Sequence, residues 1–228
     1  MPKLTSSLSL FIIGLILFDG WIWYTIVASP PVGYAMTFLD VGQGDGSLFT
    51  MNGVQMITDF GPDKAVVASL ERTIPKEDRY IDLLVVTHSD QDHSGGLQNL
   101  LSRYDAGAII WNGRDRPRGE SARWDALKDT IAEKNIPLIL VSAGDRIRYE
   151  SSTIDILSPD PLLLGGAATN DSAIVSRVTT PDFTVLLTSD INEAVETYIA
   201  ERFDVRADIL KIAHHGSRFS SVSTFLAA

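Results

Sequence analysis

The sequence lacks cysteine entirely and contains only four histidines among its 228 residues. The first absence excludes both a disulfide framework and a thiolate metal site. Any metal site must therefore consist of imidazole and carboxylate ligands, which suit zinc, manganese or iron. The histidines are confined to two places: His88 and His93 share one motif, and His214 and His215 are adjacent near the end of the chain.

Positive charge is also scarce, with 19 lysines and arginines against 29 acidic residues and a formal net charge of −10. An acidic protein has no general electrostatic attraction for nucleic acid. A nucleic-acid substrate would need a local basic patch or bound cations to offset this charge. The hydrophobic fraction of 45% is sufficient for one globular domain with a full-sized core.

One long apolar segment, residues 4–29, carries a single charge, Asp19. It is long enough to span a bilayer core of about 30 Å. Asp19 is costly at membrane depth, whereas Trp21 and Trp23 fit an interfacial belt. A retained membrane anchor and a cleaved signal peptide both fit the pattern. We favour the anchor because the segment is long for a signal peptide and a proline pair follows it.

The positive charges near this segment, Lys3 and the amino terminus, place the N-terminus in the cytoplasm by the positive-inside rule. The remainder of the chain would then face outward, or be secreted if the segment is cleaved. We therefore divide the chain into a membrane segment, residues 1–30, and a domain, residues 34–228. The Pro-containing stretch SPPVG links the two parts.

Strand patterns dominate the domain in two runs, and each run includes helices. Asn52-Gly53 marks a hairpin between two of the strands. Two mixed sheets packed face to face with helices outside fit this order, which predicts an α/β fold. Strands are expected at 34–44, 46–51, 54–61, 81–88, 106–113, 136–141, 145–150, 152–159, 172–180, 183–190 and 207–215, and helices at 64–74, 94–104, 121–135 and 192–203.

Several of these predicted strands carry an acidic residue or a histidine at or near their C-terminal ends, which suggests that the strand ends converge at one rim. The residues are Asp40, Asp59, His88, Asp190 and His214. The motif THSDQDHSGG adds Asp90, Asp92 and His93 to this set. Four ligands in six residues can contribute to two cations about 3.5–4 Å apart. In the alternative interpretation, Asp92 or Ser94 only caps the following helix.

Asp190 could bridge two cations, and one histidine of the 214/215 pair could complete the second site. Adjacent residues of an extended chain point in opposite directions, so we expect one ligand from this pair. We prefer His214 as the ligand and expect His215 either to contact a ligand or to touch the substrate.

These residues resemble a known signature. HxDxDH followed by SGG is similar to the HxHxDH motif of the metallo-β-lactamase superfamily, with Asp90 at its middle histidine. The segments LDVGQGDGSLF, ITDFG, VVTHSDQDHSGG, NDSAIVSRV, LLTSDI and LKIAHHGS resemble the C-terminal hydrolase-like domain of ComEC competence proteins. The resemblance runs from about Tyr34 to the last residues. It implies an αβ/βα four-layer sandwich with a dinuclear centre that holds up to two zinc or manganese ions.

The resemblance also implies roles for individual residues. Asp59 supports the site, and Lys211 lies where it could steady a developing anion. The implied ligands are His88 and Asp90 for the first metal, Asp92 and His93 for the second, Asp190 as the bridge and His214 or His215 as the late histidine.

Two departures from the family pattern matter. No histidine lies between His93 and Asp190, so the usual third ligand of the first metal is missing. Asn170 or Asp171 could occupy that region, and a one-metal or inactive site stays open. The sequence also stops at VSTFLAA, where related domains continue, so we expect an incomplete C-terminus.

Two further segments have two interpretations each. The glycine-rich LDVGQGDG, with Asp40 and Asp45, either approaches a ligand or the metal loop closely or forms a structural turn. The arginines at 114, 116 and 118 either bind phosphates or lie in a solvated loop. For substrate contacts we name Arg114 and Arg116, together with Asn170.

The leading hypothesis is metal-dependent hydrolysis in which Asp92 or Asp190 accepts a proton from the attacking water. The resemblance to ComEC favours a phosphodiester substrate, such as DNA outside the membrane in connection with DNA uptake. The alternatives are an ester or other acyl hydrolase and a membrane-anchored, non-catalytic binding module with a degenerate metal site.

Overall fold

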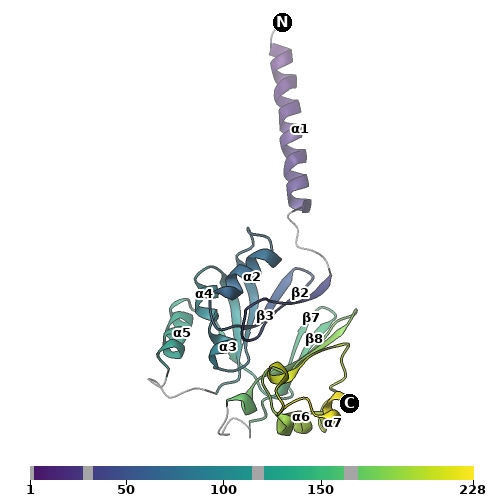
Figure 1. The fold of residues 1–228 in the computed structure, drawn as a ribbon. Coiled ribbons are helices and arrows are strands. Elements are labelled where there is room, and N and C mark those ends of the chain that lie inside the picture. Colours follow the sequence, from purple (N-terminus) through teal and green to yellow (C-terminus); the bar gives the residue numbers. More distant parts are fainter. Residues whose placement is uncertain (1–2, 28–32, 115–120, 162–168) are drawn as a thin grey trace.

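The computed structural model describes residues 3–27, 33–114, 121–161 and 169–228. Its first element is the long helix α1 (Lys3–Val27). The other described elements build two β-sheets that face each other, with helices on their outer sides (Figure 1). The predicted α/β fold with two mixed, helix-flanked sheets is confirmed.

The first sheet has six strands in chain order, antiparallel from β1 to β3 and parallel from β3 to β6. Asn52 and Gly53 adopt φ values of 47° and 91°, as a two-residue hairpin turn requires. The strands are β1 (Tyr34–Phe38), β2 (Gly46–Met51), β3 (Val54–Phe60), β4 (Tyr80–Val86), β5 (Asp105–Trp111) and β6 (Leu138–Leu140).

The second sheet has five strands in the order β11-β10-β9-β8-β7. β10 and β11 are parallel, and the other neighbours are antiparallel. The strands are β7 (Arg146–Tyr149), β8 (Ser152–Ser158), β9 (Val175–Thr179), β10 (Thr184–Leu187) and β11 (Ile209–Lys211).

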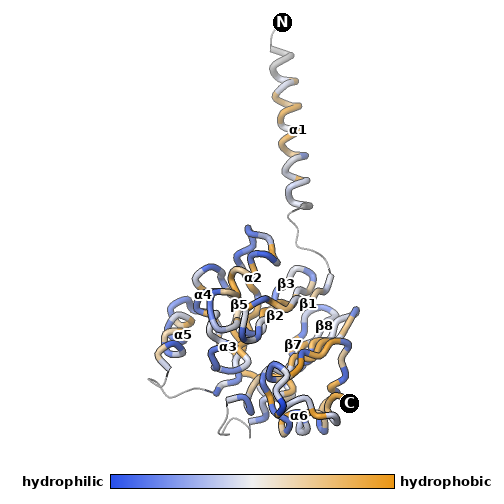
Figure 2. The backbone as a smooth tube through the Cα atoms, in the orientation of Figure 1, coloured by the Kyte–Doolittle hydropathy of each residue, from blue (hydrophilic) through white to orange (hydrophobic). Residues whose placement is uncertain are grey.

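Alternation along the strands creates three hydrophobic layers. In β4, Leu84 packs into the cluster under the outer helices of the first sheet, whereas Val85 packs between the two sheets. In β10, Leu186 packs against the helices of the second sheet. Figure 2 shows hydrophobic segments in the strands and in α1. The helices are α2 (Ala65–Thr73), α4 (Leu97–Leu101) and α5 (Ala122–Glu133) on the first sheet, and α6 (Glu193–Ala200) and α7 (Ser223–Leu226) on the second.

The helix expected at 94–104 begins earlier and is divided. The short α3 (Gln91–Ser94) starts inside the histidine motif, and α4 follows two glycines. Asp90 flanks the start of α3, so neither Asp92 nor Ser94 is the capping residue. A Cβ at Gly96 would lie 2.1 Å from the carbonyl oxygen of Phe60, so this close approach to the end of β3 requires glycine.

Helix α1 contains an apolar stretch, Ser7–Thr25, that is long and apolar enough to cross a membrane. None of this stretch is buried against the other described residues. A membrane anchor and a signal sequence both have these properties, so the helix is a candidate membrane span near the N-terminus.

Candidate metal centre

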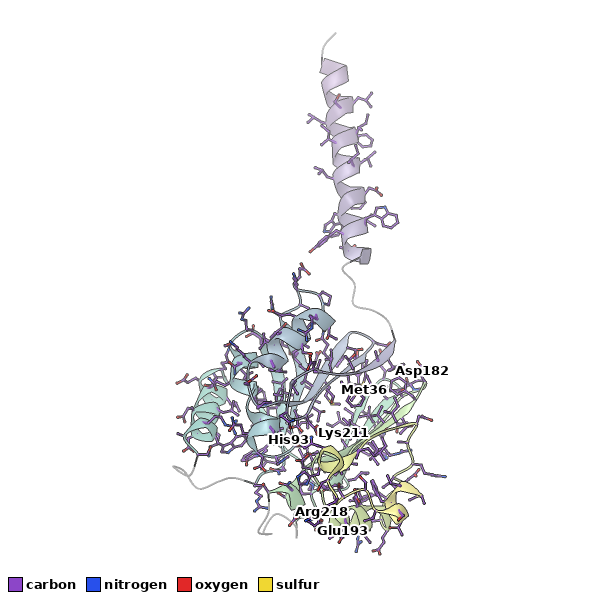
Figure 3. All side chains as sticks on the ribbon, in the orientation of Figure 1. Met36, His93, Asp182, Glu193, Lys211 and Arg218 are labelled. Carbon is purple, nitrogen blue, oxygen red and sulfur yellow. The ribbon has the colours of Figure 1, made fainter. Side chains whose placement is uncertain are left out.

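Residues far apart in the sequence meet at one edge of the two sheets. Asp59 lies at the end of β3, His88 follows β4, Asp190 follows β10 and the histidine pair follows β11. Figure 3 shows His93 and Lys211 close together where the two halves of the domain meet. The two sheets therefore contribute to the same cluster of side chains.

His93 is fully buried between two carboxylates. Its Nδ1 lies 2.7 Å from Asp59 Oδ2, and its Nε2 lies 3.2 Å from Asp190 Oδ1. Burial alone would lower the pKa of His93, but Asp59 and Asp190 outweigh that effect and raise it to about 11. Burial would raise the pKa of Asp190, but the imidazole of His93, 3.2 Å away, and those of His215 and His88 lower it to about 2. The Nδ1 side of the ring thus faces Asp59, and the Nε2 side faces Asp190.

His88 is buried beside His93, with ring centroids 4.1 Å apart. Its Nδ1 lies 3.0 Å from Thr87 Oγ1, and its Nε2 lies 3.7 Å from Asp90 Oδ2. Burial and the neighbouring His93 lower the pKa of His88, so its imidazole is neutral near pH 7. A neutral imidazole is the form that binds metals.

His215 also has both ring nitrogens engaged. Its Nδ1 lies 3.3 Å from Asp45 Oδ1, and its Nε2 lies 3.4 Å from carboxylate oxygens of Asp92 and Asp190. His214 Nε2 lies 3.8 Å from Asp190 Oδ2. The geometry therefore favours His215 over the expected His214 as the late ligand.

The expectation for this pair depended on an extended chain, and that assumption is wrong. The strand β11 ends at Lys211, and His214 and His215 follow in left-handed conformations with φ values of 49° and 53°. Consecutive left-handed residues do not alternate as strand residues do, so both rings lie near Asp190.

The ligand atoms of four residues lie within 4.8 Å of one another: Asp92, His93, Asp190 and His215. Within the described part of the chain, three buried atoms at this cluster lack a hydrogen-bond partner of acceptable geometry: His88 Nε2, His93 Nε2 and Asp190 Oδ1. Most buried polar atoms have a partner, so each exception needs an explanation. Imidazole and carboxylate around a common point fit a borderline divalent cation.

The histidines near this point are each held from behind. In metal sites a ligating histidine generally gives its other N–H to a protein acceptor, which fixes the orientation of the ring. The acceptors here are Thr87 for His88, Asp59 for His93 and Asp45 for His215. Asp59, which the resemblance implied to be a supporting residue, lies 2.7 Å from His93 Nδ1.

Asp45 was not among the predicted site residues, although the loop that carries it was singled out. A Cβ at Gly44 would lie 2.1 Å from the backbone oxygen of Asp92, and Gly44 has a φ of 131°. The amide of Asp45 donates to the same oxygen at 3.2 Å. The glycine-rich loop therefore approaches the metal loop closely. Asp40, by contrast, lies at the surface near Arg72.

A family model described as the metallo-beta-lactamase superfamily matches residues 58–228. The chain belongs to the metallo-β-lactamase superfamily. The β-hydroxylase CmlA from Streptomyces venezuelae shares this fold. The structure of its E377D mutant has a TM-score of 0.51 and 16% sequence identity, and the match covers 80% of this chain and 36% of that one.

Curated relatives support the resemblance to ComEC-type competence proteins. ComE operon protein 3 of Bacillus subtilis is 27% identical, and the match covers 65% of this chain and 19% of the relative. Recombination protein 2 of Haemophilus influenzae is 29% identical over 80% of this chain and 21% of its own length. Competence protein ComA of Neisseria gonorrhoeae is 24% identical over 93% of this chain and 28% of its own length. The chain thus spans less than a third of each relative.

The polar segment predicted as a substitute for the missing third ligand lies near Asp90. Thr169 Oγ1 donates to Asp90 Oδ2 at 3.0 Å and lies 3.2 Å from Asn170 Oδ1. Asp171 instead accepts a hydrogen bond from Asn192 at 2.7 Å. Asn170 therefore lies on the Asp90 side of the cluster, and Asp171 is engaged with Asn192.

The predicted arginines divide into described and undescribed positions. Arg114 Nη1 lies 3.4 Å from Ser172 Oγ, next to the Asn170 segment. Arg116 falls within residues 115–120, outside the described part of the chain. Arg123, which the sequence did not single out, donates to Ser94 Oγ at 3.2 Å and to the Ser89 carbonyl at 3.4 Å. Arg123 thus contacts the superfamily motif, and Arg114 contacts the segment that holds Asn170.

Lys211 forms an ion pair with the Asp45 carboxylate that also holds His215. The lysine is 19% exposed and also lines a pocket with Thr87 and Ser189. This pairing places Lys211 at the back of the cluster, because its partner Asp45 contacts the Nδ1 side of the His215 ring.

Proposed function

We propose that the chain is a metal-dependent phosphodiesterase that acts on DNA. The convergence of three supported imidazoles on two carboxylates carries this proposal, because that arrangement suits a divalent cation such as zinc or manganese. A bound cation lowers the pKa of water to roughly 7 and so supplies hydroxide at neutral pH. The residues proposed to hold up to two cations are His88, Asp90, Asp92, His93, Asp190 and His215.

The chain's own residues have distinct tasks in this proposal. Asp92 is 42% exposed, so its carboxylate can meet a substrate and accept the proton of the attacking water. Asp190 is buried where the two sheets meet, and its proposed role is to bind the cation there. The ion pair between Lys211 and Asp45 favours a supporting role for this lysine behind His215 over contact with the developing anion.

The relatives and the local charge support a nucleic-acid substrate. Two of the relatives are named for competence and recombination, which are processes that handle DNA. Arg123, which contacts the motif, and Arg114, which contacts Ser172 near Asn170, could bind phosphates together with Asn170. At the site, these groups and the bound cations would locally offset the net charge of −10 that the whole chain carries.

The proposal is tested on the full chain in detergent with manganese or zinc, using single-stranded DNA, duplex DNA and a bis-phosphodiester reporter. We expect divalent-dependent cleavage that falls at least about 100-fold in Asp92→Asn, in line with loss of an acid–base group. Asp182→Asn is the matched control because Asp182 is exposed far from His93 (Figure 3). Unchanged cleavage by Asp92→Asn, with metal content also unchanged, would refute the assignment.

Parallel assays separate the competing functions. Turnover of an ester reporter without phosphodiester cleavage would indicate an acyl hydrolase. DNA binding without turnover, in a folded protein that binds no metal, would indicate a binding module.

We further propose that α1 anchors the domain in the membrane. The N-terminus would lie in the cytoplasm and residues 34–228 outside. Support comes from the apolar stretch Ser7–Thr25 and from Lys3 before it.

A further inference from the structure

Two buried hydroxyl groups join the halves of the domain behind His88. Ser189 Oγ donates to Thr87 Oγ1 at 2.8 Å, although the two residues are 102 positions apart in the sequence. Ser189 follows β10 in the second sheet, and Thr87 follows β4 in the first. Both residues are buried, and Thr87 is the neighbour of His88 in sequence and in hydrogen bonding.

The number of protons in this network determines which nitrogen of His88 is protonated. Thr87 has a single hydroxyl proton, and it goes to Asp59 Oδ2 at 2.7 Å, because an ionised carboxylate only accepts. The Thr87 oxygen is then left as an acceptor for Ser189 and for His88 Nδ1, which lies 3.0 Å away. His88 must therefore carry its proton on Nδ1.

Ser189 would favour the opposite arrangement if Thr87 were absent. Its hydroxyl also lies 3.4 Å from His88 Nδ1 and could donate to that atom, which would move the ring proton to Nε2. Ser189 also has a φ of 50°, a left-handed conformation that a residue with a Cβ seldom adopts. The structure therefore keeps a potential donor to His88 at a backbone position that favours glycine.

We propose that Thr87 is a positioning residue for His88: by accepting from both Ser189 and the ring, it keeps the Nε2 lone pair directed at the metal pocket. In the absence of metal, Nε2 of this ring lacks a hydrogen-bond partner among the described residues. The inference rests on the metal centre of the proposed function, but the tautomer of His88 is testable without metal or turnover.

The test uses the full chain in detergent with ¹⁵N-labelled histidine, in the absence of metal. Four histidines give a small set of ring signals, and loss of one set in His88→Gln assigns that residue. Long-range ¹H–¹⁵N spectra then report which nitrogen carries the proton. We expect Nδ1–H for His88 in the wild type and in Thr87→Ser, and Nε2–H in Thr87→Val.

A second variant examines the role of Ser189. In Thr87→Val combined with Ser189→Gly, the competing donor is also absent, so we expect a mixture of tautomers. Zinc titration should show a 10- to 100-fold loss of affinity in Thr87→Val and less than about threefold in Thr87→Ser, in the range found for groups that orient metal ligands.

Two results would overturn the proposal. The first is Nε2–H on His88 in the wild type, which stays measurable even if Thr87→Val fails to fold. The second is an unchanged Nδ1–H tautomer in folded Thr87→Val. If the wild type shows the Nδ1–H tautomer but binds no zinc or manganese, the proposed hydrolase fails while the tautomer assignment stands.

Discussion

The carboxylate of Asp59 orients two histidines, His93 directly and His88 through Thr87. Replacing one of its oxygens with nitrogen, in Asp59→Asn, should therefore disturb both rings. The carboxylate accepts three hydrogen bonds: Thr87 N to Oδ1, and Thr87 Oγ1 and His93 Nδ1 to Oδ2. In Asp59→Asn, the amide oxygen can keep the Thr87 N–H. The amide nitrogen then faces Thr87 Oγ1 and His93 Nδ1 and donates to both, so each must become an acceptor.

This exchange changes the protonation of both rings. In the metal-free wild type the raised pKa of His93 keeps protons on both nitrogens, and a cation would replace the one on Nε2 while Asp59 keeps the one on Nδ1. In the variant, His93 accepts at Nδ1 and is a neutral ring whose one proton lies on Nε2, toward Asp190. Thr87, now accepting from the amide, directs its own proton at His88 Nδ1, which moves the His88 proton to Nε2 as well. The two nitrogens proposed as ligands are thereby blocked. The pKa of His93, which Asp59 helps to raise to about 11, should fall toward its ordinary value.

The magnitude follows from the kind of bonds exchanged. Three hydrogen bonds to a charged group, about 1.5–3 kcal/mol each, become neutral bonds of about 0.5–1.5 kcal/mol. Because every partner can still be satisfied, we expect a stability loss of roughly 1–4 kcal/mol. In a domain of this size that corresponds to roughly 3–15 °C in Tm. Zinc affinity should fall by about 10- to 100-fold.

The assays are thermal unfolding of the metal-free chain and zinc titration of the folded chain. Asp82→Asn is the matched control, because Asp82 also accepts a backbone bond between β3 and β4, from Gln55 N at 2.8 Å. It should lower stability by about 1 kcal/mol and leave zinc affinity unchanged. Wild-type zinc affinity in Asp59→Asn, with His93 still protonated at Nδ1, would show that the tautomer reasoning is wrong.

Two further predictions concern the histidine pair and the membrane segment. His215→Ala should lower zinc affinity by at least tenfold in titration, and His214→Ala should lower it by less than about threefold, because His215 is the one held by Asp45; equal losses would contradict this choice. The chain has no cysteine, so Asp182→Cys provides a unique thiol. A membrane-impermeant maleimide should label it in intact bacterial cells that express the full chain. Labelling only after lysis would show that the proposed orientation is wrong.

Much of the fold was predictable because local signals agreed with the final packing. Continuous apolar runs such as residues 83–86 become strands covered on both faces, with alternate residues in different hydrophobic clusters. The Asn52-Gly53 turn adopts the left-handed geometry that its residues favour. The motif residues His88 and His93 were visible as candidates because histidine is so rare in the chain.

The remaining site residues depended on contacts that sequence spacing does not contain. Asp45 reaches His215 only because β11 of the second sheet ends opposite the glycine-rich loop of the first. Thr87 and Ser189 are common residues with no spacing signal, and their bond joins the two sheets. The orientation of the histidine pair depends on two left-handed residues, which are uncommon for residue types other than glycine.

The acidic composition is easier to understand once the charges are placed. Four carboxylates lie at the cluster, those of Asp45, Asp59, Asp92 and Asp190. In the metal-free chain their negative charge is offset by the ammonium group of Lys211 and by the positive charge of His93, whose pKa is raised. A bound divalent cation would replace the positive charge that His93 provides. Because His88, Asp92 and His93 come from the first sheet, and Asp190 and His215 from the second, the same ion would also join the two halves of the domain. A bound cation would therefore also hold the two sheets together, as the hydrogen bond between Thr87 and Ser189 does without it.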